Sequence, residues 1–167
     1  MQSQQRALAI INQEQLALYY GIGRFVSVNT RNKNWGTGFI EAISEQLRKE
    51  LPGLRGFSAA SLRKMRTFYE EWQMLSDNSF VETNNLISEK HNSFVGTNEL
   101  PTVQFKIDAN FPIAAFMNIG FTHHYVIISK VKDTEQRKFY IQFAADTKAK
   151  VEDLERMIND DLYSHQG

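Results

Sequence analysis

The sequence predicts a mainly α-helical fold, a multi-helix domain with one helix-turn-helix-like hairpin and one long irregular insertion. Over most of the chain, apolar residues recur at spacings of three, four and seven, which is the period of amphipathic helices. That period is lost from residue 76 to residue 110, where Asn and Ser become frequent. The length of 167 residues suits one ordinary domain, and the chain has no cysteine, so neither disulfides nor thiolate chemistry contribute.

The first helix is expected from about Gln4 to Val28, and a polar turn is expected over residues 29–34. A second helix should follow a cap at Thr37 and stop at Leu51-Pro52-Gly53, because Pro disfavours helical geometry in the residue before it. Two apolar faces support these helices: Leu8, Ile11, Leu18, Tyr19, Ile22, Phe25 and Val26 in the first, and Ile40, Ile43, Leu47 and Leu51 in the second.

Ser58 is placed to cap a third helix that runs from Ala59 to Trp72. At about 100° per residue, its apolar and basic side chains fall on opposite arcs. The apolar arc holds Leu62, Met65, Phe68, Tyr69 and Trp72, and the other holds Arg63, Lys64, Arg66 and Thr67, with Ala59 and Ala60 beside them.

Helical patterning returns after Pro112, over residues 113–117, 122–130, a helix capped at Asp133, and a last helix from about Lys150. Gln136 occupies the capping-box position after Asp133. The expected apolar faces are Phe139, Tyr140, Phe143 and Ala144, then Val151, Leu154, Met157 and Ile158. The predicted organisation is a basic helical half with the hairpin at 1–75, an irregular insertion at 76–110, and C-terminal helices at 111–167 that pack on the same domain.

The insertion contains a duplication, because residues 78–84 recur as residues 92–98 with six of seven positions identical. Two copies are too few for a solenoid, which needs about three or more repeats to bury a core. A duplicated loop segment is the favoured interpretation, with short strand pairing through Phe80-Val81 and Phe94-Val95 as an option.

The net charge is zero, but the charges are distributed unevenly along the chain. Residues 1–66 hold ten basic and four acidic side chains, and the remainder holds nine basic and fifteen acidic ones. A basic half suggests a surface that binds a polyanion. The alternative is that these charges lie on solvated helix faces that bind nothing charged, and the charge distribution alone does not decide between the two. No apolar run approaches the roughly 18–20 residues of a membrane span and no signal-peptide pattern is present, so we expect a cytoplasmic protein without a membrane partner.

Signals for catalysis, cofactors and metals are scarce. Gly21-Ile22-Gly23 lies within a helical pattern and lacks the third glycine of a dinucleotide fingerprint. His123 and His124 are adjacent, so on a helix they point about 100° apart and are better suited to packing or surface roles. Asp146-Thr147-Lys148 is expected at a helix end rather than on the strand that a restriction-type nuclease needs. We therefore expect no catalytic residues, no metal, no cofactor and no small-molecule substrate.

The segment from Ile40 to Trp72 has the outline of a helix-turn-helix, with two helices, a tight turn containing Pro and Gly, and a basic outer face on the second helix. Such a motif lays its second helix in the major groove of double-stranded DNA. An ordinary helical hairpin whose basic residues face water produces the same pattern. The candidate DNA-contacting residues are Arg48, Lys49, Arg55, Ala60, Ser61, Arg63, Lys64 and Arg66.

Several motifs, in order along the chain, resemble the N-terminal domain of the bacterial YhcG-like proteins, long catalogued as a domain of unknown function. They are Tyr20-Gly21-Ile22-Gly23-Arg24, Trp35-Gly36, Leu47-Arg48-Lys49-Glu50-Leu51-Pro52, Gly56-Phe57-Ser58, Leu62, Met65-Arg66-Thr67-Phe68-Tyr69, His124-Tyr125, the segment 133–140 and Leu154-Glu155. The resemblance implies a helix-turn-helix DNA-binding module that usually precedes a PD-(D/E)xK nuclease domain. This sequence ends at Gly167 without such a core, so nuclease activity is not carried over.

The leading hypothesis is a sequence-tolerant DNA-binding domain. The alternative is a protein-interaction module that docks a nuclease or modification subunit, or a second copy of the chain, and a third option is the targeting half of an enzyme completed by a partner. A contiguous basic face joining Arg48, Arg55, Arg63 and Arg66 would favour DNA. Dispersal of these residues, or their pairing with Glu45, Glu50 and Glu70, would favour protein interaction.

Overall fold

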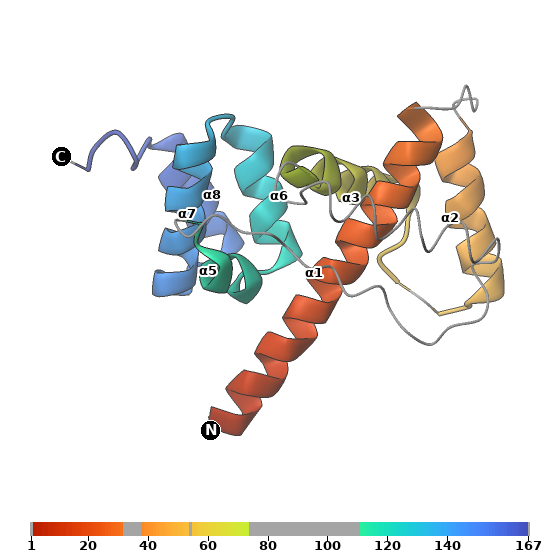
Figure 1. Ribbon diagram of the computed structural model, residues 1–167, viewed down its shortest axis with the longest axis horizontal. Helices are drawn as coiled ribbons and strands as arrows, with labels where there is room; N and C mark the ends of the chain where they lie inside the picture. The colour runs from red at the N-terminus through yellow and green to blue at the C-terminus, as the bar shows by residue number, and fades with distance from the viewer. Residues whose placement is uncertain (1, 32–37, 54, 74–110, 167) are drawn as a thin grey trace.

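The computed structural model describes residues 2–31, 38–53, 55–73 and 111–166, and within these ranges it contains seven helices and no strand (Figure 1). The mainly α-helical prediction is confirmed. The duplicated segments at 78–84 and 92–98, and the insertion that holds them, lie outside the described residues.

Helix α1 runs from Gln2 to Arg31, three residues beyond the predicted end. The predicted polar turn from Asn29 is wrong at its start, because two polar side chains bond back to carbonyls one turn earlier. Asn29 Nδ2 donates to Phe25 O at 2.7 Å, and Thr30 Oγ1 donates to Val26 O at 2.7 Å. These bonds stay within the helix and let the polar residues continue it.

Helices α2, Phe39–Glu50, and α3, Ala59–Trp72, form the predicted hairpin. Ser58 caps α3 by accepting a hydrogen bond from the Ser61 amide, as predicted. Helix α2 begins directly after Gly38, and Thr37, the predicted cap, lies outside the described residues. Residues 51–58 separate the two helices, which is longer than the three or four residues of a tight helix-turn-helix connection.

The remaining helices are α5, Ile113–Asn118; α6, Phe121–Lys130; α7, Thr134–Thr147; and α8, Val151–Asn159. Asp133 caps α7 by accepting a hydrogen bond from the Gln136 amide at 3.0 Å, as predicted. The apolar face of α7 differs from the prediction because Ile141 and Arg137 join Tyr140 and Ala144 in the interior. Phe139 and Phe143 are only half-buried there.

Helix α3 is central to the packing, because its buried residues belong to two hydrophobic clusters. The smaller cluster joins α1, α2 and α3 through Val26, Ile40, Leu62 and Met65. The larger cluster joins α1 and the second half of α3 to the C-terminal helices, and includes Leu16, Tyr20, Phe68, Trp72, Phe116, Ile127, Ile141 and Leu154. One continuous arc of α3 therefore holds the hairpin against the rest of the fold.

Helices α1 and α3 are in close contact at Gly23. A Cβ atom built on Gly23 would lie 2.0 Å from the Met65 carbonyl oxygen, so only hydrogen fits at this position. The neighbouring Gly21 faces open space instead. The first glycine-containing motif of the sequence thus includes one residue required for helix packing.

Arg137 is the one charged side chain among the buried described residues. Its Nε donates to Val131 O at 2.6 Å, its Nη2 donates to Ile128 O, and its Nη1 pairs with Glu71 at 2.9 Å. The side chain therefore satisfies carbonyls at the C-terminal end of α6 and links α7 to α3, so its charge is compensated.

Candidate nucleic-acid interface

The amino-terminal half of α3 carries the predicted outward basic face. Leu62 and Met65 are buried in the smaller cluster, which turns Ala60, Arg63 and Lys64 outward, and these three side chains are exposed. In helix-turn-helix proteins, residues near the start of the second helix are the ones that reach base edges. The orientation of this half of α3 is therefore set by the apolar arc on its other side.

Arg63 forms an ion pair across the hairpin with Glu41 of α2. The hydrogen bond from Arg63 holds the pKa of Glu41 below its ordinary value. Both side chains remain roughly half exposed, at 44% and 50%, so water screens the pair. Lys49 is paired in a similar way with Glu45 one turn earlier, at 3.5 Å. Two of the candidate cations thus have carboxylate partners, although only Glu45 was among the predicted partners.

Arg66 is half-buried between α3 and α1 rather than displayed on the surface. Its Nη1 donates to Thr30 Oγ1 at 3.3 Å, and its buried Nε has no hydrogen-bond partner among the described residues. Burial lowers the pKa of Arg66, and the nearby positive charge of Arg31 lowers it further. Arg66 is therefore less able to reach a ligand than its neighbours on α3.

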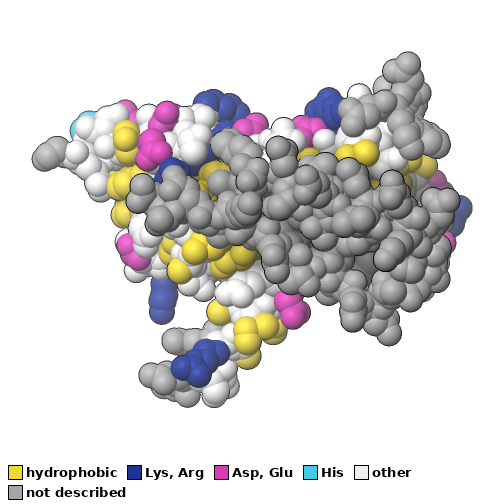
Figure 2. Space-filling view, viewed as in Figure 1, with side chains coloured by type: hydrophobic (Ala, Val, Ile, Leu, Met, Phe, Trp, Pro, Cys, Tyr) yellow, Lys and Arg dark blue, Asp and Glu magenta, His cyan; other side chains and the backbone are white. Residues whose placement is uncertain are grey.

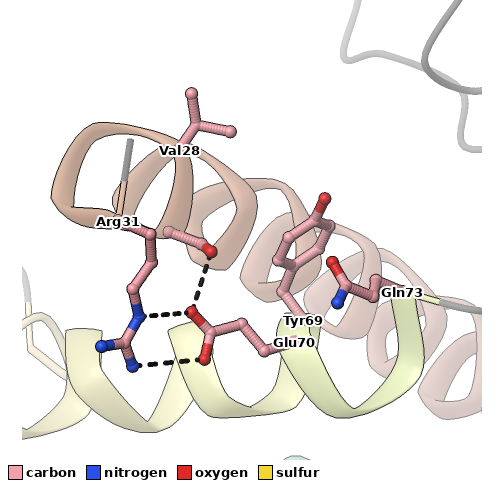
Figure 3. A pocket seen from close by; sticks show the side chains of 6 residues that line it. Val28, Arg31, Tyr69, Glu70 and Gln73 are labelled. Carbon is pink, nitrogen blue, oxygen red and sulfur yellow. Dashed lines mark hydrogen bonds and ion pairs between the residues drawn. The ribbon is translucent and has the colours of Figure 1, made fainter. Parts of the chain in front are cut away.

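A small hollow of about 390 Å³ separates the C-terminal ends of α1 and α3. In Figure 3, Arg31 of α1 and Glu70 of α3 face each other across it, and Ser27 also donates to Glu70. Burial alone would raise the pKa of Glu70, but the hydrogen bonds from Arg31 and Ser27 outweigh it and the pKa is lowered. Glu70 therefore pairs with Arg31, a residue that lies beyond the predicted end of the first helix and outside the predicted site.

Arg48 and Arg55 line a second hollow, of about 240 Å³, where the end of α2 meets the start of α3. Both are exposed, and neither forms an ion pair within the part of the chain that the structure describes. The Ser44 hydroxyl donates to Phe57 O at 2.9 Å and fixes the connecting segment against α2. Gly56, with φ +91°, and the capping Ser58 complete the wall. Two arginines thus lie beside the amino terminus of α3.

Lys64 extends over the ring of Tyr125 on α6, with its Nζ 5.0 Å from the ring centroid. The predicted residues consequently form an alternating surface rather than one unbroken basic face. Figure 2 shows dark blue and magenta side chains next to one another along the upper edge of the molecule. The first turn of α3 holds Ala60 and Ser61, and beside it lie Arg48 of α2 and Arg55 of the connecting segment. Arg63 and Lys49 form ion pairs with carboxylates. Arg66 turns towards α1.

Other candidate chemistry has a structural explanation. His124 is fully buried with its Nε2 2.8 Å from Phe116 O, and His123 Nε2 lies 2.8 Å from Ala149 O. No group of three or more His, Asp or Glu side chains placed to hold a metal occurs among the described residues. Lys148 follows the last residue of α7, so Asp146-Thr147-Lys148 lies at a helix end, as predicted.

None of the helices in the described ranges is both long and apolar enough to cross a bilayer.

The structure defines a mainly α-helical domain whose hairpin of α2 and α3 carries basic and acidic side chains on its surface. The chain belongs to the DUF1016 N-terminal domain family, whose model matches residues 1–165. This match confirms the resemblance to the N-terminal domain of YhcG-like proteins. It is a match to a domain of unknown function, and no curated protein and no solved structure matches the chain.

Proposed function

We propose that this domain binds double-stranded DNA through the phosphate backbone, with little dependence on sequence, and targets a nuclease or another activity to DNA in the cytoplasm. The contacts come from the start of α3 and the adjacent end of α2. The chain by itself is not expected to cut DNA.

One observation carries the proposal: Arg48 and Arg55 flank the amino terminus of α3 without an acidic partner among the described residues. A helix amino terminus presents backbone N–H groups and the positive end of the helix dipole, both of which favour phosphate. Ser58 uses the amide of Ser61, so the amides of Ala59 and Ala60 are the first-turn donors that remain. A phosphate in this hollow would meet two guanidinium groups and a helix end.

The paired cations are a second source of affinity. Exposed ion pairs contribute about 0–1 kcal/mol, so a DNA phosphate can displace Glu41 from Arg63 or Glu45 from Lys49 at small cost. Lys64 adds an exposed charge on the same half of α3. Arg66 contributes to DNA affinity through its electrostatic field rather than through direct contact with phosphate, because it is half-buried against α1.

The test is fluorescence anisotropy of a labelled duplex at two salt concentrations. Arg48→Glu with Arg55→Glu should weaken binding by at least about tenfold and lower the salt slope by about two, because each arginine neutralises about one phosphate. The matched control is Lys148→Glu with Lys150→Glu, which reverses two exposed charges near the junction of α7 and α8. If both double variants lose the same affinity, binding reflects overall charge and the proposed site is wrong.

The second candidate function is a protein-interaction module that docks a nuclease or modification subunit. The ion pairs Arg63–Glu41 and Lys49–Glu45 favour it, because they alternate the sign of charge across the hairpin surface. Absence of duplex binding even at low salt, by a protein whose circular dichroism remains helical, would favour this function over DNA binding.

A further inference from the structure

Helix α1 exposes an apolar stripe on the side opposite its packed face. Six large apolar side chains of α1 are between 39% and 66% exposed: Leu8, Ile10, Ile11, Leu18, Phe25 and Val28. Three of them, Ile11, Leu18 and Phe25, project from the same side of the helix and form this stripe. Figure 2 shows yellow side chains on the part of α1 that projects from the body. Large apolar side chains exposed along one side of a helix are a candidate interaction surface.

The spacing of the stripe places it on one line along the helix. Ile11, Leu18 and Phe25 are seven residues apart, which is two helical turns, so their side chains point in nearly the same direction. Leu16 and Tyr20, buried in the larger cluster, project from the other side of α1. The stripe is therefore a second apolar face, separate from the one that holds α1 to α3.

The stripe is symmetric about Leu18. Ile11 and Phe25 lie seven residues before and after it. If two copies of α1 pack antiparallel, Leu18 meets its own counterpart and Ile11 faces the partner's Phe25. A two-fold interface requires this self-complementarity, because the same patch is used on both subunits.

We propose that α1 is a dimerisation helix that packs antiparallel against α1 of a second copy of this chain, about a two-fold axis at Leu18. This inference does not depend on DNA binding. It assigns the exposed stripe to an isologous interface and commits to a second copy as its occupant.

The charges of α1 favour the antiparallel orientation. α1 carries one acidic residue, Glu14, and three basic residues, Arg6, Arg24 and Arg31. A parallel pair would place each Glu14 beside its own counterpart and each Arg24 beside its own. The antiparallel pair places Glu14 near the partner's Arg24, on the same flank of the interface, and also opposes the two helix dipoles.

The projecting end of α1 is explained by the same arrangement. Asn12 Nδ2 donates to Met117 O at 2.7 Å and to Ile119 O at 2.8 Å, which ties this level of α1 to α5. Ahead of Asn12 the helix extends away from the body, and Leu8 and Ile11 are more than half exposed (Figure 1). A short helical segment is marginal in water on its own, so the partner's Phe25, packed on Ile11, would help to stabilise it.

The first experiment is sedimentation equilibrium of the 167-residue chain from roughly 5 to 200 μM, which covers dissociation constants in the micromolar range. Wild-type protein should dimerise. Leu18→Glu, which sets two like charges against each other on the axis, should weaken the dimer by at least about thirtyfold. Gln13→Glu, a matched charge on an exposed position away from the stripe, should leave it unchanged. A monomeric wild type, or equal dimerisation by Leu18→Glu, overturns the proposal.

The second experiment uses the absence of native cysteine. Under mild oxidation Leu18→Cys should form a disulfide-linked dimer, whereas Gln13→Cys should not. When Ile11→Cys and Phe25→Cys proteins are mixed, the mixed disulfide should predominate over either symmetric one. Predominance of the symmetric disulfides would mean a parallel pair and overturn the antiparallel arrangement, and equal cross-linking of Gln13→Cys would mean random collision.

Discussion

His124 makes the free energy of unfolding depend on pH. The ring is fully buried, 4.2 Å from the Phe116 ring between centroids, and its Nε2 donates to Phe116 O because a carbonyl only accepts. The other nitrogen, Nδ1, is buried without a hydrogen-bond partner among the described residues. Burial therefore lowers the pKa of His124 from 6.5 to about 4.

The sign and size of the effect follow from proton linkage. As the pH falls through 6.5, the unfolded chain binds a proton at His124, while the folded protein stays neutral until about pH 4. The stability present above pH 6.5 is therefore lost as the pH falls. With these two pKa values, the loss attributable to His124 between pH 7.5 and pH 5 is about 2 kcal/mol, and the full loss is roughly 3 kcal/mol.

The assay is urea denaturation at pH 7.5 and pH 5.0, with wild-type protein and the His124→Phe variant. The variant lacks the titrating group and keeps an apolar ring, so contributions from carboxylates cancel in the comparison. Wild-type protein should lose about 2 kcal/mol more than the variant between the two pH values. Equal losses would refute the reasoning, as would an NMR titration that places the pKa of His124 near 6.5, a measurement that needs no variant.

Two other predictions test packing. Gly23→Ala should destabilise the protein by at least about 2 kcal/mol in thermal or urea unfolding, because the new Cβ would overlap the Met65 carbonyl. Gly21→Ala places its Cβ in open space and should stabilise the helix by up to about 1 kcal/mol. Equal effects at the two glycines would contradict the close approach of α1 and α3. Arg137→Met should lower the free energy of unfolding by about 3–5 kcal/mol, because it leaves buried carbonyls and a carboxylate unpaired. Lys138→Met on the same helix removes only an exposed ion pair and should lower it by under about 1 kcal/mol. A neutral Arg137→Met would mean that relaxation or water replaces these bonds.

Periodicity is sufficient to predict the helices that bury one strongly apolar face. The predicted range of α3 is correct to the residue, and so are the caps at Ser58 and Asp133, because a cap and a buried arc act within one or two turns of the chain. The predicted helix end is wrong where a polar side chain can either form a turn or bond back to a helix carbonyl. Asn29 and Thr30 have the composition of turn residues, but they bond back to the helix and extend α1 to Arg31.

The candidate site is less predictable than the helices, because its properties depend on which residues meet across helices. The charge of Arg63 is visible in the sequence, but its pairing with Glu41 requires the crossing of α2 and α3. Arg66 lies on the polar arc of α3, yet α1 packs along that side and half-buries it. The closeness of Arg48 and Arg55 depends on the shape of residues 51–58, which no repeating pattern specifies.

The bonds from Asn12 to residues 117 and 119 have a consequence for synthesis of the chain. These contacts span 105 and 107 residues, so α1 leaves the ribosome long before its partners on α5 exist. At about 5–20 residues per second, the interval is roughly 5–20 s. During that time Leu16 and Tyr20, which the finished protein buries, have no C-terminal helices to cover them. We therefore expect newly made α1 to bind chaperones that recognise exposed apolar segments near the ribosome.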